Sequence, residues 1–89
     1  MLFMVIERFK QRDVAQIGER FIRNGRMLPD NVVYHASWVD SEGACCFQLM
    51  EAPRPEMLNA GVGCWSDLID FEIVPVLTSA EFWSKQQLG

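Results

Sequence analysis

Apolar and polar side chains alternate from Val32 to Glu51, and this pattern predicts two β-strands on either side of a short polar turn. Both strands are rich in β-branched and aromatic residues, which are the types favoured in sheets. Residues 40–43, with the sequence Asp-Ser-Glu-Gly, supply the turn, because short polar residues and glycine fit tight connections. Strict alternation places Tyr34 and Trp38 on one face of this hairpin and His35 on the other. We expect the hairpin to form the centre of a sheet onto which the rest of the chain packs.

A further strand and a first helix are predicted before the hairpin. Residues 2–9 contain no polar side chain before Glu7, which indicates a strand that is covered on both faces and is therefore central. Asp13 and Gln16 have the spacing of a capping box, and Asn24-Gly25 is a typical helix end. Between these ends a single apolar stripe is formed by Val14, Ile17, Gly18, Phe21 and Ile22.

The chain after the hairpin predicts a second helix, a fourth strand and a short closing helix. The second helix covers about residues 56–68, and its two glycines predict a close approach to the sheet. Residues 71–77 form the strand, and Pro75 places it at a sheet edge or at a bulge, because proline cannot donate a ladder hydrogen bond. Thr78 and Glu81 have the spacing of a second capping box, which begins the C-terminal helix.

These elements follow the order β-α-β-β-α-β with a short C-terminal helix, which predicts an α+β, ferredoxin-like fold in a single domain over residues 1–89. Two helices can cover only one face of such a sheet. Several strands are nevertheless apolar on both faces, so the second face needs another cover. We therefore predict a homodimer in which two sheets pack face to face as a dimeric α/β barrel.

Composition and charge narrow the class of protein. The 89 residues carry a formal net charge of -4, which argues against non-specific binding to nucleic acid. Residues 1–26 hold six basic against three acidic side chains, whereas the remainder is strongly acidic, so faces of opposite sign are expected. The three cysteines do not form a disulfide pattern, and the apolar N-terminus is too short for a signal peptide or a membrane span. We expect a soluble, cytoplasmic protein without a membrane or nucleic-acid partner.

Several segments carry a family resemblance: WSDLIDFEIVPVLTSAEFW at residues 65–83, GRMLP at 25–29 and CFQLMEAP at 46–53. With these segments nearly the whole chain resembles a small bacterial family of uncharacterised domains, a resemblance that implies no activity. The layout is also similar to that of the dimeric α/β-barrel superfamily. This second resemblance concerns the fold alone, and it implies cofactor-independent monooxygenases, lactone isomerases, haem-degrading enzymes and ligand-sensing modules as candidate functions.

His35, the only histidine, is the first candidate for chemistry, because an imidazole titrates near neutral pH. It would act as a general base, oriented by Glu72 or Glu7, in proton abstraction from a phenol or a carbon acid. The alternative is a structural histidine that is hydrogen-bonded to the backbone or to Ser37, which alternation places on the same face. Ser37, Gln48 and Glu7 are polar positions on otherwise apolar strands, and we expect them to contact a ligand.

Metal and cofactor sites are not predicted. Cys45 and Cys46 are adjacent and would point to opposite faces of a strand, so they cannot both bind one zinc ion with Cys64 and His35. A catalytic thiol needs an electropositive surrounding that the nearby sequence does not supply. His35 is also the only conceivable axial ligand for haem, and haem binding is not our prediction.

The predicted function is accordingly a small homodimeric domain that binds a small molecule, with aromatic compounds as one class of ligand. The alternative is a cofactor-independent monooxygenase or isomerase of the dimeric α/β-barrel type, with His35 as its general base. A cavity with His35 in its wall beside a carboxylate would favour the enzyme. A filled interior would favour a structural or interaction role.

Overall fold

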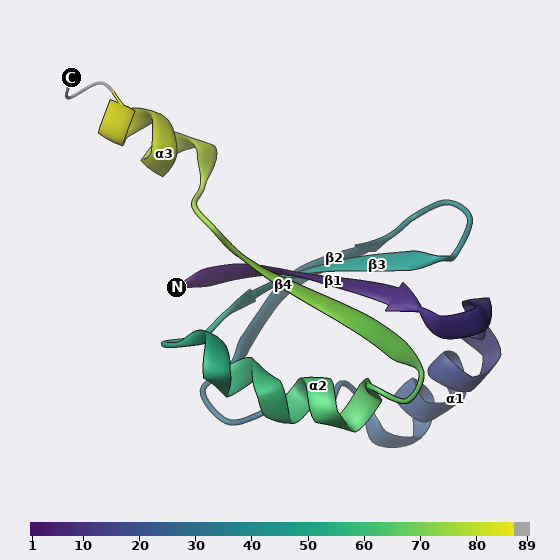
Figure 1. Ribbon diagram of the computed structural model, residues 1–89. Helices are drawn as coiled ribbons and strands as arrows, with labels where there is room; N and C mark the ends of the chain where they lie inside the picture. Colours follow the sequence, from purple (N-terminus) through teal and green to yellow (C-terminus); the bar gives the residue numbers. More distant parts are fainter. Residues whose placement is uncertain (87–89) are drawn as a thin grey trace.

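The computed structural model describes residues 1–86 and contains, within that range, a four-stranded antiparallel sheet and three α-helices (Figure 1). The strands are β1 Leu2–Phe9, β2 Val33–Val39, β3 Cys45–Glu51 and β4 Ile69–Val76. The helices are α1 Val14–Asn24, α2 Asn59–Trp65 and α3 Ser79–Gln86, and 3-10 helices cover Lys10–Arg12 and Pro55–Leu58. The α+β class and the order of the elements along the chain are as predicted.

The strands lie in the order β2-β3-β1-β4, so β1 is central and pairs with both β3 and β4. The prediction of a central first strand is confirmed, and Pro75 lies on the edge strand β4. The prediction that both strands of the hairpin are central was wrong for β2, which forms the other edge. The reason is that β1, apolar along nearly its whole length, takes the place between β3 and β4 where it is most completely covered.

The hairpin turn is held by Asp40 at the end of β2. Its Oδ1 accepts hydrogen bonds from the backbone N–H of Cys45 at 2.8 Å and of Ala44 at 2.7 Å. These bonds stabilise the carboxylate and lower the pKa of Asp40. Gly43 has a φ of 71°, a conformation that residues with a Cβ rarely adopt. The polar turn predicted between the two strands is therefore confirmed.

Strand β2 contains a bulge that the sequence did not predict. Tyr34 pairs with Met50 and Ala36 pairs with the preceding residue of β3, so His35 is an extra residue without a partner of its own. The bulge shifts the alternation beyond it, and Ser37 lies on the same face as Tyr34, whose hydroxyl it contacts. The prediction that His35 and Ser37 share a face was therefore wrong.

Helices α1 and α2 both lie on one face of the sheet, here called the inner face (Figure 1). A cluster of buried side chains belongs to this face: Phe3, Val5, Val32, Met50, Ala52 and Leu58. Helix α1 contributes no buried residue, and Ile22, which the apolar pattern placed in its stripe, is exposed to solvent. Helix α2 begins later than predicted, because the chain first forms the 3-10 helix at Pro55–Leu58.

The ends of α1 and α3 are set by the predicted capping residues. Asp13 Oδ1 accepts a hydrogen bond from the backbone N–H of Gln16 at 3.2 Å, and Gly25, with a φ of 67°, ends α1. Thr78 Oγ1 accepts a hydrogen bond from the backbone N–H of Glu81 at 3.1 Å, which begins α3. Helix α3 is thus encoded in its own sequence, although none of its residues is buried and it extends away from the sheet (Figure 1).

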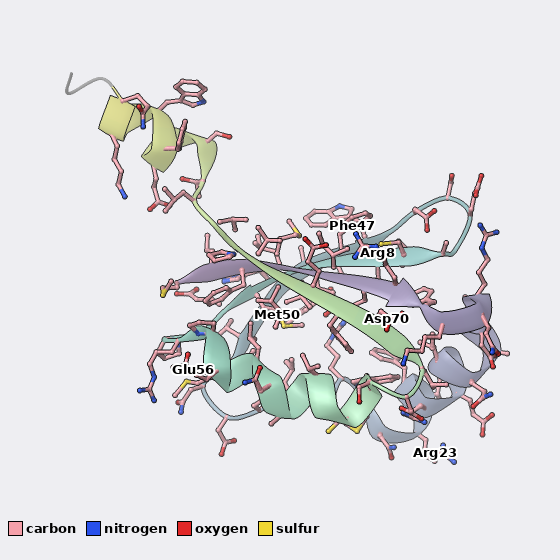
Figure 2. The ribbon with its side chains drawn as sticks, in the orientation of Figure 1. Arg8, Arg23, Phe47, Met50, Glu56 and Asp70 are labelled. Atoms are coloured by element: carbon pink, nitrogen blue, oxygen red, sulfur yellow. The ribbon has the colours of Figure 1, made fainter. Side chains whose placement is uncertain are left out.

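The opposite face of the sheet, here called the outer face, has no helix packed over it within residues 1–86 (Figure 1). Phe47 of β3 lies on this face, on the other side of the sheet from Met50 (Figure 2). Trp38 pairs with Phe47 across the strands, and both side chains are exposed, as is Val33. The prediction that the two main helices would cover only one face is confirmed. The described helices are all too short or too polar to cross a membrane.

Candidate functional site

A cavity of about 380 Å³ lies between the inner face of the sheet and the helices α1 and α2. Its walls are mostly apolar and include Val5, Val14, Ile17, Phe21, Leu58 and Trp65. Part of the space exists because α1 presents Gly18 to it, and a Cβ added at Gly18 would meet no atom within 4 Å. The volume is in the range of ordinary ligand pockets, and it would hold a molecule of about one or two rings.

Glu7, on β1, places a buried carboxyl group in the wall of this cavity, with 7% of its surface exposed. Gln48, on the neighbouring strand β3, donates a hydrogen bond from Nε2 to Glu7 Oε2 at 2.5 Å. Burial raises the pKa of Glu7 to about 7, although the nearby Arg26 and the hydrogen bond from Gln48 both oppose that shift. Both the protonated and the ionised forms of Glu7 are therefore accessible near neutral pH.

Gln48 leaves one of its polar atoms without a partner. Its Oε1 is buried and accepts no hydrogen bond from the residues that the structure describes. Ser37, which pairs with Gln48 across the strands, also lines the cavity, and its hydroxyl lies 2.7 Å from the hydroxyl of Tyr34. The structure thus places Ser37, Gln48 and Glu7, the three residues expected to contact a ligand, in the wall of one cavity.

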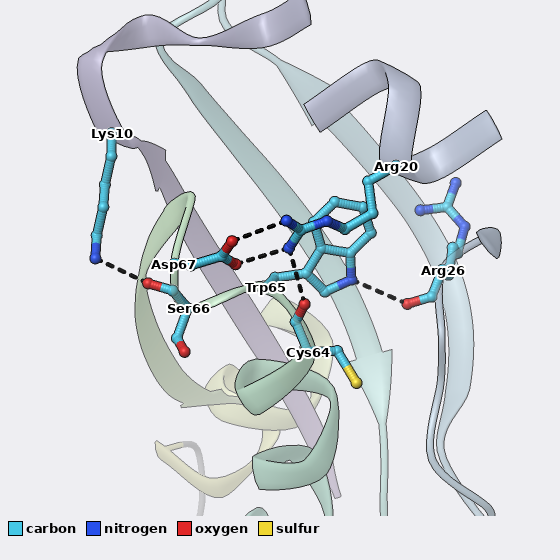
Figure 3. A network of polar contacts seen from close by, with 7 residues as sticks. All are labelled: Lys10, Arg20, Arg26, Cys64, Trp65, Ser66 and Asp67. Carbon is cyan, nitrogen blue, oxygen red and sulfur yellow. Dashed lines mark hydrogen bonds and ion pairs between the residues drawn. The ribbon is translucent and has the colours of Figure 1, made fainter. Parts of the chain in front are cut away.

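Arg26, in the loop after α1, also lines the cavity and was not among the predicted site residues. Its guanidinium lies over the ring of Tyr34 at 3.7 Å and over the ring of Phe21 at 5.2 Å. Trp65 Nε1 donates a hydrogen bond to the carbonyl oxygen of Arg26 at 3.3 Å, so α2 fixes this loop (Figure 3). The sequence shows Arg26 only as one of several arginines in the basic N-terminal region, and that pattern carries no signal for a cavity.

Arg20 ties α1 to the end of α2 (Figure 3). Its guanidinium donates two hydrogen bonds to the carboxylate of Asp67, at 2.7 and 2.8 Å, and another to the carbonyl oxygen of Cys64 at 3.2 Å. These bonds from Arg20 lower the pKa of Asp67, and the guanidinium also lies 5.6 Å from the ring centre of Trp65. Trp65, one wall of the cavity, is therefore held through contacts with both Arg20 and Arg26.

Cys46 lines the cavity with a thiol that stays protonated near neutral pH. Burial, helped by the nearby Glu7, raises the pKa of Cys46 to about 11. The thiol is therefore a neutral packing group and not a nucleophile. Cys45, Cys46 and Cys64 are all free, and residues 1–86 hold no cluster of three or more His, Cys, Asp or Glu side chains placed to bind a metal ion.

His35 and Glu72, the two residues predicted to be catalytic, lie on the outer face, away from the cavity. His35 is exposed, and its Nε2 lies 2.9 Å from Glu51 Oε1, whereas Glu72 pairs with Arg8 at 3.1 Å. The expected pairing of His35 with Glu7 or Glu72 was wrong, because Glu7 is on the opposite face and Glu72 is on β4, at the other edge of the sheet from β2. A hollow beside His35 is lined by Met1, Leu2, Glu51, Pro75, Leu77 and Glu81.

Comparison with known proteins identifies a family but no activity. The family model described as a domain of unknown function, DUF3303, matches residues 1–87. The chain matches no curated protein and no solved structure. The resemblance to a family of uncharacterised domains is thereby confirmed.

Proposed function

Because the chain belongs to the DUF3303 family, whose function is unknown, we propose its function from the cavity: the protein binds a small, largely apolar molecule between its sheet and its helices. The observation that carries this proposal is the pair of the buried Glu7 and the half-buried Gln48, which leaves a buried amide oxygen without a partner among the described residues. An unsatisfied buried polar group destabilises a protein by about 1–3 kcal/mol, and functional sites are among the places where proteins keep such groups.

The surroundings of this pair also support ligand binding. Apolar walls with a few converging polar groups are the usual construction of a small-molecule site. A carboxyl group whose pKa lies near 7 is a further property that functional sites share. A domain with a purely structural role would gain stability by filling the same space, because apolar voids destabilise a core.

We further propose that the protein is a ferredoxin-like homodimer in which two outer faces pack as a dimeric α/β barrel. The strand order β2-β3-β1-β4, with α1 and α2 on one face, supports this arrangement. The exposed side chains of Trp38, Phe47 and Val33 on the outer face support a surface that a second copy covers. Helix α3 adds Phe82 and Trp83, both exposed, on a segment that reaches beyond its own sheet.

Ligand binding is tested by native mass spectrometry of freshly purified protein, followed by NMR titration with small aromatic molecules. Gly18→Leu places a large side chain into the cavity from α1, and we expect it to abolish binding while α1 stays folded, since leucine favours helices. Gly63→Leu on α2 is the matched control, because Gly63 is exposed and does not line the cavity. Binding that survives Gly18→Leu unchanged would contradict the proposal.

The homodimer is tested by sedimentation at micromolar concentration, where we expect twice the chain mass of 10.2 kDa. Phe47→Lys places a charge on the outer face and is expected to yield monomers. Ile22→Lys, the same kind of change at an exposed position of α1, should leave the mass unchanged. A wild-type protein that sediments as a monomer would refute the dimer but not the ligand site.

A second candidate function is a cofactor-independent enzyme with His35 as general base. The observation in its favour is the hydrogen bond between His35 and Glu51, since a base held by a carboxylate is a common catalytic arrangement. A suitable probe is hydrogen–deuterium exchange of a carbon acid in deuterated water, followed by NMR. If His35 is the base, the wild-type protein should accelerate the exchange and the His35→Gln variant should not. Equal exchange rates with and without wild-type protein would count against it.

A further inference from the structure

We propose that the cavity selects neutral, ring-sized molecules that carry a hydroxyl group, and that this hydroxyl is bound by Gln48 and Glu7. The inference rests on the proposed function, because it names the class of ligand that the same cavity takes. Three features carry it: the free end of the Gln48 amide, the second oxygen of the Glu7 carboxyl group and the apolar walls around both.

The amide of Gln48 has a donating end and an accepting end, and only one of them is used. Nε2 donates to Glu7, while the buried Oε1 has no partner among residues 1–86. If the amide were turned over, its oxygen would accept the proton of a neutral Glu7 and the free end would be the donor. In either orientation one buried amide atom remains for a group of the ligand.

Glu7 supplies a second hydrogen-bonding atom close to that amide. Its bond to Gln48 uses Oε2, so Oε1 is left to meet a ligand. Oε1 donates when the carboxyl group is protonated and accepts when it is ionised. The charged and titratable groups that face Glu7 are Arg26, from the loop after α1, and Cys46, from β3. A hydroxyl group matches the pair when Glu7 is protonated, because it can donate to Gln48 Oε1 and accept from Glu7 Oε1. When Glu7 is ionised the hydroxyl can still donate to one of the two oxygens, whereas an ether cannot satisfy Gln48 Oε1.

The surroundings favour a neutral molecule over an anion. A carboxylate in this cavity would lose its hydration among apolar walls and would lie near the carboxyl group of Glu7. Arg26, the cation in the lining, already stacks on the rings of Tyr34 and Phe21. A space of about 380 Å³ holds a substituted ring but not a long chain. Phenols and small alicyclic alcohols are therefore the class that fits.

The test compares four probes of similar size by NMR titration of the wild-type protein: p-cresol, toluene, 4-methylanisole and 4-methylbenzoate. At about pH 6 the cresol is neutral and the benzoate is ionised. We expect p-cresol to bind about 5- to 10-fold more tightly than each of the other three, because it alone is neutral and can donate to Gln48 Oε1. Equal affinities for p-cresol and toluene, or tightest binding by 4-methylbenzoate, would overturn the inference and leave small-molecule binding intact. A lack of binding by all four probes would overturn both.

Gln48→Met tests the amide itself, because it keeps the length of the side chain and removes both polar ends. We expect this variant to bind toluene as the wild type does and to bind p-cresol no more than about 2-fold better than toluene. Phe47→Met, at the preceding position of β3 but on the outer face, is the matched control and should keep the full preference. A preference for p-cresol that persists in Gln48→Met would overturn the assignment of the hydroxyl to Gln48.

Discussion

The two faces of the sheet are built from the same strands but differ in what covers them. On β3, Met50 points to the helices with 8% of its surface exposed, whereas Phe47 points to the open side with 36% exposed (Figure 2). The inner face therefore encloses its apolar side chains within one chain, around a cavity. The outer face leaves apolar side chains such as Trp38 and Val33 in contact with water. The comparison teaches that one sheet can bury the apolar side chains of one face within its own chain and leave those of the other face in water, and we propose a ligand for the first face and a partner for the second.

The polar groups on the two faces differ in the same way. The inner face holds Glu7, whose burial favours its neutral form, in a hydrogen bond with Gln48. The outer face holds pairs that remain accessible to water, such as Arg8 with Glu72 at 3.1 Å. Pairs exposed in this manner contribute about 0–1 kcal/mol, whereas buried polar groups have larger effects of either sign. Substitutions on the inner face should therefore have the larger consequences.

Met50→Ala is expected to have the largest effect on stability. Met50 belongs to the buried cluster with Phe3 and Leu58, and its removal enlarges the existing cavity. We expect the free energy of unfolding, measured by urea denaturation, to fall by about 2–5 kcal/mol.

Phe47→Ala is the matched change on the outer face of the same strand. In dilute protein, where any dimer has dissociated, we expect it to lower the free energy of unfolding by about 1 kcal/mol or less, because the ring is already partly exposed. At higher concentration the wild type should gain stability from association and the variant should gain less. Equal losses of stability for Phe47→Ala and Met50→Ala in dilute protein would contradict the comparison. They would mean that a single chain buries its outer face as completely as its inner face.

Local signals in the sequence were sufficient for most of the fold. The capping residues Asp13 and Thr78 and the turn at Asp40 set element ends through contacts with residues three to five positions away, so their patterns are readable in the chain. The position of β2 at an edge was not readable, because strand order depends on pairings between distant segments.

The candidate site was predicted only in part, for a related reason. Glu7, Ser37 and Gln48 stand out as polar residues on apolar strands, and the structure brings them to one cavity. The bulge at His35 has no signal in the sequence, because strict alternation continues through it, and its presence separates His35 from Ser37, which it turns to the inner face. Arg26 could not be found either, since its place depends on Trp65, a residue of another helix.

Glu7→Gln is expected to have the next largest effect on the free energy of unfolding. It should raise this free energy above pH 7, whereas Met50→Ala lowers it. Burial raises the pKa of Glu7 from 4.5 to about 7, which corresponds to about 3 kcal/mol against the ionised form. Glutamine has nearly the same shape and can still bond to Gln48, but it never ionises. We subtract the free energy of unfolding of the wild type from that of the variant. This difference should be up to about 3 kcal/mol larger above pH 7 than at low pH.

The direction of this pH dependence follows from the proton balance of Glu7. Between pH 4.5 and about 7 the folded protein retains the proton that the unfolded chain has lost, so the wild-type free energy of unfolding falls as pH rises through this window. Urea denaturation of both proteins across the window measures the effect, and groups such as Asp40 and Asp67 cancel in the difference. A difference between the two proteins that does not change with pH would contradict the burial of an ionisable Glu7.

His35→Gln is expected to have a smaller effect than Met50→Ala or Glu7→Gln. The side chains of His35 and Glu51 are 40% and 51% exposed, so their hydrogen bond should contribute about 1 kcal/mol or less to the free energy of unfolding. We also expect the affinity for p-cresol to stay within about 2-fold of the wild type, because His35 lies across the sheet from the cavity. NMR titration of His35→Gln and of Gln48→Met with p-cresol compares the effect of one substitution on each face on the same affinity. A loss of affinity in His35→Gln as large as that in Gln48→Met would contradict the separation of the two faces. It would mean that His35 belongs to the ligand site, as the sequence predicted.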